Sequence, residues 1–582
     1  MRKMKKITYL LFVVSVALLT GVSCDVLEEE IVSGVTVDTH YNTPDGFRDA
    51  VNAAYERFRY FYGNEDGEEA TVFGTDEYTN GGHGGAQYIN KYIAGLDGES
   101  GTFWYPWQHF YIGINTCNAV INRAPDAEIP EDEKAVLVGE VKFLRAQYYF
   151  HLVQFWGPVH LTLEETIGVE TEAQRDPESD IYQAIIADLE DAIDVLPMAQ
   201  DEWGRITRPA AQHALAHVYL TRAYQDFGQG TDDFSAAADL ALEVINNSDR
   251  VLLDDYQRVY NSDDGSGGLV HTTESEQNDE IIWSIQYSAD MLLNGDGNQS
   301  HLHFRPWYET FNDGLDRALG HGYGRPWIRF RPTLWMLENF RPLDVDSRYE
   351  KSFQTVWLYN TDRNIPAGAE VGDTAIWITD KSAAEIDTAA IRARLPGVNL
   401  FTWNADEIDQ DWCLYRSEAW KQANNYANSP NINIFPSPWK IDDNLRPSLN
   451  EQRGSRDFVV YRLGETYLIA AEAMLGRDGN ASNAVEYINE IRRRAAYDGK
   501  EAEMEVSAGE VDLDFILDEW TRECFGEQSR WLDLKRTGKL LERVRAHNPD
   551  AAPNIKDFHV MRPIPVNQIT RTTNDYGQNP GY

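Results

Sequence analysis

The chain has 582 residues and a formal net charge of −42, from 52 lysines and arginines against 94 aspartates and glutamates. Its hydrophobic share of 42% and aromatic share of 12% are enough to fill a core, which excludes bulk disorder. The charge argues against nucleic acid as a partner and against docking on anionic lipid through a basic patch. Four cysteines, at 24, 117, 413 and 524, exclude a dense disulfide framework, and their spacing matches no zinc motif.

The N-terminus has the pattern of a secretory signal. Basic residues between positions 2 and 6 precede an apolar run over 7–22, and the small residues of Gly21-Val22-Ser23 precede Cys24. We predict a lipoprotein signal over residues 1–23, with Cys24 lipidated as the first residue of the mature chain. The alternative is an ordinary signal peptide that ends near a cysteine, since a glycine stands at 21 where lipoprotein signals usually carry leucine. Glu28-Glu29-Glu30 resembles the surface-export signal of some Gram-negative lipoproteins, or is a solvated charge run.

The first predicted helices flank a glycine-rich stretch. Residues 40–60 show amphipathic spacing, and Thr43-Pro44-Asp45 is a helix-capping sequence. Residues 61–103 are rich in glycine with interspersed tyrosines, and they are predicted to form a long loop region. Helical periodicity returns over 104–122 and again over 133–156.

Further segments repeat the amphipathic pattern as pairs rich in alanine and tyrosine. They span 180–196, 209–226, 233–247, 460–475 and 480–496, and the chain is helical again over 513–545. Repeated helical pairs of this composition resemble tetratricopeptide units. We therefore predict a mainly α fold, with a tetratricopeptide-like scaffold of helical pairs over about 40–250 and 455–582.

A large irregular region interrupts this scaffold between about 251 and 454. Short β-like runs such as Ile281-Ile282-Trp283-Ser284-Ile285 alternate there with turns, glycine, proline and many aromatic residues. Long stretches of low periodicity usually carry function. We assign residues 24–582 to one domain, in which this loop-rich region binds the ligand.

The sequence offers no catalytic motif. No GxSxG, HExxH, Walker or GxGxxG-after-strand pattern appears. Acidic pairs such as Asp76-Glu77, or Glu519 with Glu523, could be nominated for a hydrolase, but such pairs are uninformative among 94 acidic residues. His301 and His303 lie two residues apart, and without a third ligand they do not define a metal site. These residues predict neither a catalytic nor a metal centre.

Aromatic residues are concentrated in the irregular region, above all over 299–335. Sugar rings present flat C–H faces that stack on aromatic rings, while polar side chains bind the hydroxyl groups. We therefore expect a site for a polar ligand at the segment 290–330 and the loop 61–103. The candidate ligand-binding residues are Trp307, Tyr308, Tyr323, Trp327, Arg325, His301, Asp76, Tyr78 and Asn80. Packing in the core is the equal alternative for the first three.

Motifs spread along nearly the whole chain carry a resemblance to a known family. They are Tyr41-Asn42-Thr43-Pro44-Asp45-Gly46-Phe47, Lys142-Phe143-Leu144-Arg145-Ala146-Gln147-Tyr148-Tyr149-Phe150, Gly204-Arg205-Ile206-Thr207, Tyr461-Arg462-Leu463-Gly464-Glu465, Arg530-Trp531-Leu532-Asp533-Leu534-Lys535-Arg536 and the closing Gln578-Asn579-Pro580-Gly581-Tyr582. Each is weak alone, but in this order and behind a lipoprotein-like signal they are highly specific. The chain resembles the SusD/RagB family of outer-membrane nutrient-binding lipoproteins.

The resemblance implies a fold, a location and partners. It implies tetratricopeptide-like helical pairs with a variable ligand region, a lipid-anchored position on the outer membrane facing the cell exterior, and no catalysis. It implies a TonB-dependent, SusC-like outer-membrane barrel, on which the protein sits as an extracellular lid. Ligands in the family are usually oligosaccharides, although some members take peptides. Some members hold a structural calcium ion, and no other cofactor is implied.

We therefore expect a cell-surface glycan-binding lipoprotein that delivers oligosaccharides to the barrel. Three alternatives stay open: an oligopeptide-binding member of the same scaffold, a secreted glycosidase, and an assembly protein whose helical grooves bind only the barrel. An acidic pocket with strong salt sensitivity would favour basic peptides. Turnover of a glycan would favour the enzyme, and the absence of any small ligand would favour the assembly protein.

Overall fold

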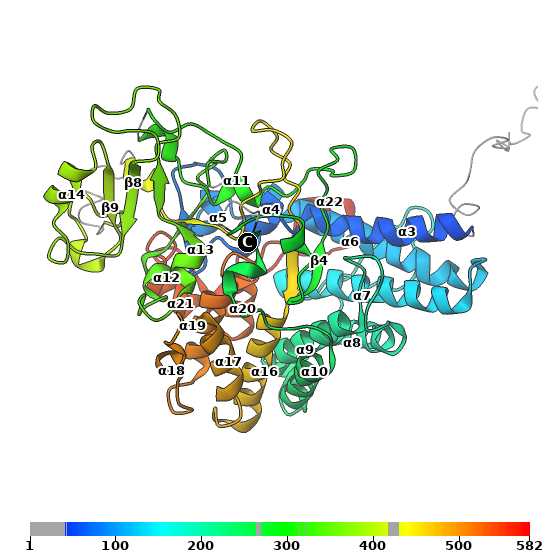
Figure 1. The fold of residues 1–582 in the computed structure, drawn as a ribbon. Helices are drawn as coiled ribbons and strands as arrows, with labels where there is room; N and C mark the ends of the chain where they lie inside the picture. Colours follow the sequence, from blue (N-terminus) through cyan, green and yellow to red (C-terminus); the bar gives the residue numbers. More distant parts are fainter. Residues whose placement is uncertain (1–40, 42, 264–268, 312, 321, 417–429) are drawn as a thin grey trace, which may run out of the picture.

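A computed structural model describes residues 41–582 except 42, 264–268, 312, 321 and 417–429 (Figure 1). The predicted signal peptide, Cys24 and the acidic stretch after it lie outside the described residues. Within the described part, no helix has the length and apolar character needed to cross a bilayer. The fold is mainly helical, as predicted, with short strands between the helical parts.

Long helices occupy most of the predicted segments and pack in succession. They are α3 (Pro44–Glu56), α6 (Gly101–Arg123), α7 (Glu131–Trp156), α8 (Glu178–Val195), α9 (Arg208–Ala223), α10 (Asp233–Asn247), α16 (Leu463–Asp478), α17 (Val485–Ala495) and α19 (Leu513–Cys524). Helix α6 packs on α7, α7 on α8, α8 on α9 and α9 on α10. Helix α16 returns to pack on α10, while α17 and α19 pack on α16. Two distant parts of the sequence therefore form one helical scaffold with a continuous apolar core.

Shorter helices complete the C-terminal part. The segment 513–545, predicted as helical, divides into α19, α20 (Arg530–Arg536) and α21 (Leu540–His547), and α18 (Glu501–Met504) and α22 (Val566–Arg571) lie before and after it. Gly526 separates α19 from α20 with φ of +72°, a conformation that favours glycine. The division places side chains of α20 and α21 against the N-terminal part of the chain.

Helix α3 shows why these segments are helical. The Thr43 Oγ1 accepts a hydrogen bond from the Gly46 N–H at 3.1 Å, which caps the first turn. Pro44 has the backbone angle that this turn needs and lacks the N–H that would have no partner there. Apolar residues at helical spacing face the core, and burial of each large side chain contributes about 1.5–3 kcal/mol. The buried residues are Gly46, Phe47, Ala50, Val51 and Ala54.

The glycine-rich stretch 61–103 is not the long loop that its composition predicts. It contains α4 (Glu65–Thr71), β1 (Tyr78–Asn80) and α5 (Gln87–Lys91), and every residue over 67–81 is buried. A Cβ on Gly67 would lie 1.9 Å from the Phe61 carbonyl oxygen. The glycines therefore allow backbone to pack inside the molecule, and they do not mark a solvent-exposed loop.

The irregular region is built from short elements that pair across long sequence distances. Its strands are β2 (Ser262–Asp263), β3 (Leu269–Val270), β4 (Ile281–Ile285), β5 (Phe330–Pro332), β6 (Phe353–Gln354), β7 (Val356–Leu358), β8 (Thr374–Thr379), β9 (Asn399–Thr402) and β10 (Ser437–Pro438), and β11 (Phe458–Arg462) leads into α16. The predicted strand at 281–285 is confirmed as β4, which pairs antiparallel with β11 and is buried along its length. Strands β7, β8 and β9 form a sheet that lies, with α14 (Thr388–Arg394), at the end of the molecule opposite α3 (Figure 1).

A buried network of ion pairs joins the irregular region to the scaffold. Arg462, at the end of β11, contacts Glu280 at 3.2 Å and Glu523 of α19 at 2.7 Å. Arg494 of α17 pairs with the same two glutamates, and Arg348 of α13 (Arg348–Ser352) contacts Glu523 at 3.1 Å. Burial would raise the pKa of Glu523, but the three arginines lower it to about 2. The carboxylate is therefore charged at neutral pH, and each buried charge has a partner of opposite sign.

Candidate functional site

The stretch 61–103 and the segment 290–330 lie side by side. A single site formed by both stretches requires this arrangement. Strand β1 pairs antiparallel with β5. Beyond the strands, the Gly81 N–H donates to the Arg329 carbonyl at 2.8 Å. A Cβ on Gly81 would lie 2.2 Å from the Ile328 carbonyl oxygen, so this close approach requires glycine. Hydrogen bonds between backbones therefore fix the two stretches against each other.

Four of the predicted residues are partly exposed. We call them the aromatic surface and define it as Trp307, Tyr323, Arg325 and Trp327. Trp307 has the largest exposed fraction among the tryptophans of this segment, 39%, and its Nε1 donates to Glu309 at 3.1 Å. Partly exposed aromatic rings can stack on the flat faces of a ligand, and a partly exposed guanidinium group can bind its oxygen atoms.

Backbone hydrogen bonds hold the two tryptophans of the aromatic surface in place. The Trp307 N–H donates to the Asn433 carbonyl at 2.7 Å, and the Trp327 N–H donates to the Leu302 carbonyl at 2.9 Å. The Arg329 guanidinium lies 5.7 Å from the Trp327 ring centroid, within the range of a cation–π contact. Because the rings are already positioned, binding costs less conformational entropy than it would with free side chains.

Tyr308 lies beneath the aromatic surface and not on it. It has no exposed surface, and its hydroxyl donates to the carbonyls of Tyr323 (2.5 Å) and Gly324 (3.1 Å). The Tyr323 hydroxyl accepts from the Leu358 N–H and donates to the Leu358 carbonyl, both at 2.9 Å. Of the two alternatives for Tyr308, ligand binding and packing in the core, the structure supports packing, because burial and internal hydrogen bonds account for its ring and its hydroxyl.

His301 is also inside the molecule, on α11 (Ser300–His303), and the structure corrects the expectation that it faces a ligand. Its Nδ1 lies 3.1 Å from the Asn298 carbonyl oxygen. Burial and the nearby Arg446 lower the pKa of His301 well below its ordinary value, so the ring is neutral. Within the ranges that the structure describes, no group of three or more His, Cys, Asp or Glu residues is placed to hold a metal ion. The structure therefore names no ligands for the calcium ion that the resemblance allowed.

Asp76, Tyr78 and Asn80 are interior residues too, and the structure corrects the expectation that they contact a ligand. Asp76 and Tyr78 have no exposed surface, and Asn80 is 8% exposed. Asp76 contacts Arg530 of α20 and Arg543 of α21, each at 2.7 Å. Burial would raise the pKa of Asp76, but the two arginines lower it to about 2. Asp76 therefore joins the N-terminal part of the chain to its C-terminal helices.

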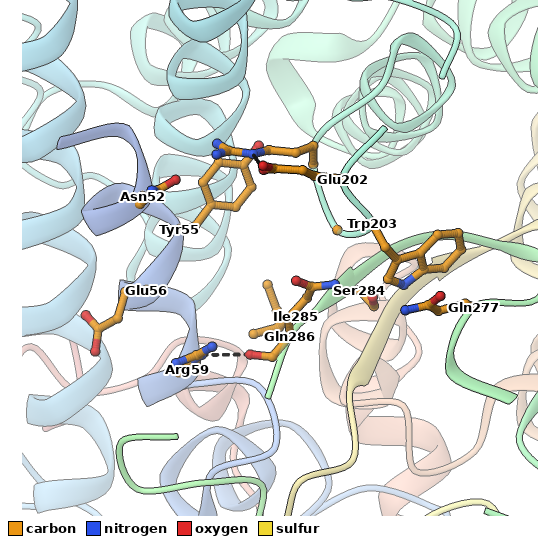
Figure 2. Close-up of a pocket in the computed structure, with 12 residues that line it drawn as sticks. Asn52, Tyr55, Glu56, Arg59, Glu202, Trp203, Gln277, Ser284, Ile285 and Gln286 are labelled. Atoms are coloured by element: carbon orange, nitrogen blue, oxygen red, sulfur yellow. Dashed lines mark hydrogen bonds and ion pairs between the residues drawn. The ribbon is translucent and has the colours of Figure 1, made fainter. Parts of the chain in front are cut away.

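A second candidate site, which the sequence does not predict, is a cavity of about 660 Å³ between α3, the turn 202–205 and β4 (Figure 2). We call it the Trp203 cavity. Its walls carry aromatic rings, amides and a guanidinium group, from Asn52, Tyr55, Arg59, Trp203, Gln277 and Gln286. These residues come from three distant parts of the chain, so no single segment signals the cavity. The one available cue is a tryptophan inside the charged turn Asp201-Glu202-Trp203-Gly204-Arg205.

The sequence and the fold together identify the class of protein. Residues 279–582 match the SusD family, and residues 53–220 match a family described as starch-binding associating with outer membrane. The starch-binding protein SusD of Bacteroides thetaiotaomicron is 32% identical over 470 residues, which cover 76% of this chain and 72% of that protein. The chain belongs to the SusD family.

Further relatives extend over the whole molecule. SusD-like protein P2 of Formosa agariphila is 25% identical over 597 residues, which cover 100% of both chains. A laminarin-binding SusD-like protein has the same fold, with a TM-score of 0.66 at 20% identity over 93% of this chain and all of that one. Surface glycan-binding protein A of Bacteroides thetaiotaomicron, solved with laminarihexaose, aligns with a TM-score of 0.64 at 20% identity over 92% of this chain and 99% of that one.

Proposed function

We propose that this protein is a non-catalytic, cell-surface lipoprotein that captures oligosaccharides and passes them to a TonB-dependent outer-membrane transporter. The observation that carries the proposal is the aromatic surface, on which the rings of Trp307, Tyr323 and Trp327 and the side chain of Arg325 are all partly exposed. Indole rings and polar side chains are the groups with which proteins bind sugars. Relatives of this family and fold are named for binding starch and laminarin.

The acidic pairs that could suggest a glycosidase are buried inside the fold. Glycoside hydrolysis needs two carboxyl groups that face a substrate at a defined separation. Glu519 and Glu523 have no exposed surface, and both contact Arg348. Asp76 is likewise buried and paired with arginine. These carboxylates bind arginines inside the fold and do not face a substrate.

The identity of the ligand is tested by affinity electrophoresis of the protein beginning at Asp25 against plant, microbial and host polysaccharides. One glycan class should retard the wild-type protein, and Trp307→Ala should reduce the retardation. Tyr105→Ala is the matched control, because Tyr105 is a 53% exposed ring on α6, outside the aromatic surface. Equal retardation of both variants would move the binding site elsewhere, and no retardation by any glycan would favour peptides or a site completed by the barrel.

The anchor is tested separately in cells. Cys24→Ala should leave the protein unanchored, because the acyl chains that hold it in the membrane attach to this cysteine. The measurement is the share of protein recovered with the outer membrane, and recovery equal to wild type would refute lipidation at Cys24.

Co-purification of a TonB-dependent barrel with the wild-type protein tests the proposed partner in the same preparation.

A further inference from the structure

The Trp307 side chain is connected to a pair of charged residues, Glu309 and Arg317, which the sequence does not predict. The Trp307 Nε1 donates to Oε1 of Glu309 at 3.1 Å. The Arg317 guanidinium donates to the same carboxylate through two atoms, Nε to Oε2 at 2.7 Å and Nη2 to Oε1 at 2.5 Å. We call these two residues the Glu309–Arg317 pair. It links an exposed part of the aromatic surface to a charged group that has its own fixed geometry.

The contact between Arg317 and Glu309 at two points fixes the direction of the carboxylate. A planar guanidinium that meets both oxygens of a carboxylate allows one orientation, whereas a single hydrogen bond would let the carboxylate rotate. Oε1 of Glu309 accepts from both Trp307 and Arg317. Arg317 therefore holds this oxygen in the direction of the indole N–H.

The backbone of Trp307 is fixed independently of the pair. Its N–H donates to the Asn433 carbonyl at 2.7 Å, and its carbonyl accepts from the Thr310 Oγ1 at 2.9 Å. With the backbone held at both groups, the side-chain torsions are the main freedom left to the ring. The hydrogen bond to Glu309 restrains these torsions, so the position of the ring is defined at three atoms.

The restrained atom is not the part of the ring that stacks on a ligand. The indole N–H lies at the edge of the ring and in its plane, whereas stacking uses the faces. Trp307 is 39% exposed although its N–H is bound to Glu309. The pair itself lies near the surface, with 19% of the Glu309 side chain and 38% of the Arg317 side chain exposed. Ion pairs in such positions contribute little to folding stability, so the pair can be altered without unfolding the protein.

We propose that Glu309 and Arg317 are positioning residues of the glycan site, in which Arg317 orients the Glu309 carboxylate and the carboxylate holds the Trp307 ring ready to stack on a sugar. This role rests on the proposed function, in which a glycan stacks on Trp307. A ring that is already fixed loses less conformational entropy when the ligand binds. The pair acts through the ring and does not itself contact the sugar.

The first test needs no ligand. In protein with isotope-labelled tryptophan, the indole N–H signal of Trp307 in the NMR spectrum is identified by its absence from Trp307→Ala. Glu309→Ala removes the acceptor, so the signal should move to lower proton frequency and its proton should exchange faster with water. Arg317→Lys keeps the charge but not the contact at two points, and it should move the signal less, in the same direction. Arg363→Gln is the matched control, because Arg363 forms an exposed ion pair with Asp316, and it should leave the signal in place. An unmoved Trp307 signal in Glu309→Ala would overturn the proposal.

The second test is calorimetric titration of the whole mature chain with laminarihexaose and with maltohexaose, fragments of the polysaccharides for which relatives are named. Glu309→Ala should weaken binding about threefold to tenfold at an unchanged melting temperature. In the Trp307→Ala background the same substitution should cause no further loss, because the pair acts through the ring. A further loss of equal size would show that Glu309 contacts the sugar directly, and it would overturn the positioning role.

The same variants separate the positioning role from the proposed function. If Trp307→Ala binds as tightly as wild type, the aromatic surface is not the glycan site, and the proposed function loses the observation that carries it. If Trp307→Ala weakens binding and Glu309→Ala does not, the proposed function stands and the positioning role is refuted. The NMR measurement decides whether the pair fixes the ring even if neither hexasaccharide binds.

Discussion

The helical scaffold and the irregular region are held together in different ways. Helices of the scaffold pack through small buried residues, such as Ala214 of α9, Ala241 of α10 and Ala470 of α16, all without exposed surface. The irregular region relies on short strand pairs, on hydroxyl groups that bind backbone and on buried arginines, and it leaves Trp307 partly exposed. Stability and ligand binding therefore depend on different residues, so a substitution can alter one without the other.

The largest loss of stability is expected in the buried network of ion pairs that joins the two regions. Arg462→Met removes the cation shared by Glu280 and Glu523 and leaves buried carboxylates without a full set of partners. The free energy of unfolding should fall by about 3–5 kcal/mol, measured by urea unfolding followed by circular dichroism. Arg493→Met is the matched control, because Arg493 pairs near the surface with Glu486 and Glu490 of α17 and with Glu505, and its loss should change stability by less than about 1 kcal/mol. Similar losses in the two variants would contradict a special role for the buried network.

The second effect concerns pH. The pKa of Asp76 is lowered from 3.8 to about 2 in the folded chain, so its contribution to stability is present above pH 3.8 and is lost as pH falls through 2. A shift of this size corresponds to about 2 kcal/mol. Asp76→Asn leaves Arg530 and Arg543 without their shared carboxylate, so we expect it to lose about 3 kcal/mol at pH 7.

The same variant should also show a shallower loss of stability between pH 5 and pH 2 than wild type, by about 2 kcal/mol. Urea unfolding at several pH values measures this difference. Asp557→Asn, at a 92% exposed side chain, is the control and should follow the wild-type profile. A profile for Asp76→Asn parallel to wild type would show that Asp76 does not titrate as proposed.

A smaller effect is expected beneath the aromatic surface. Tyr308→Phe removes the hydroxyl that donates to the carbonyls of Tyr323 and Gly324, and the ring keeps its packing. Unfolding should become easier by about 1–2 kcal/mol, seen as a lower melting temperature. Tyr105→Phe, on an exposed ring, should stay within about 0.5 kcal/mol of wild type. If Tyr308→Phe weakened glycan binding at unchanged stability, the Tyr308 hydroxyl would belong to the binding site after all.

The smallest loss of stability is expected at Trp307, on the aromatic surface. Trp307→Ala should lower the free energy of unfolding by about 1 kcal/mol, because 39% of the residue is exposed and only the buried part of the ring loses packing. Its affinity for the glycan should fall by more than about 1 kcal/mol, which is about fivefold. The two measurements are calorimetric titration and thermal unfolding on the same sample. A large loss of melting temperature would assign Trp307 to packing.

The sequence predicts the scaffold well, because a buried face repeats at helical spacing whatever the helix packs against. The α7 segment predicted over 133–156 begins at Glu131 and ends at Trp156. The prediction from composition is wrong over 61–103, since glycine can indicate close backbone packing as readily as a loop. Local pattern cannot separate the two cases, because the packing partners lie elsewhere in the chain.

The binding residues are predicted less well, for a related reason. The segment that carries Trp307 and Trp327 was found from its aromatic content, and β1 and β5 confirm that it meets the stretch 61–103. Whether a ring or a carboxylate faces solvent depends on distant partners, as with Asp76 and its arginines on α20 and α21. The Trp203 cavity was missed because its walls come from separate segments whose proximity only the fold creates.

The way in which the aromatic surface is attached has a consequence for how such proteins diversify. Backbone hydrogen bonds hold both ends of the segment between Trp307 and Trp327. The Trp307 N–H donates to the Asn433 carbonyl, and the Trp327 N–H donates to the Leu302 carbonyl. Chain between two fixed points can be lengthened or exchanged at a modest entropic cost, which grows only slowly with loop length. New ligand preferences could therefore arise by exchange of the exposed residues of this segment, while the buried Tyr308, the helices and the buried ion pairs that fold the protein stay the same.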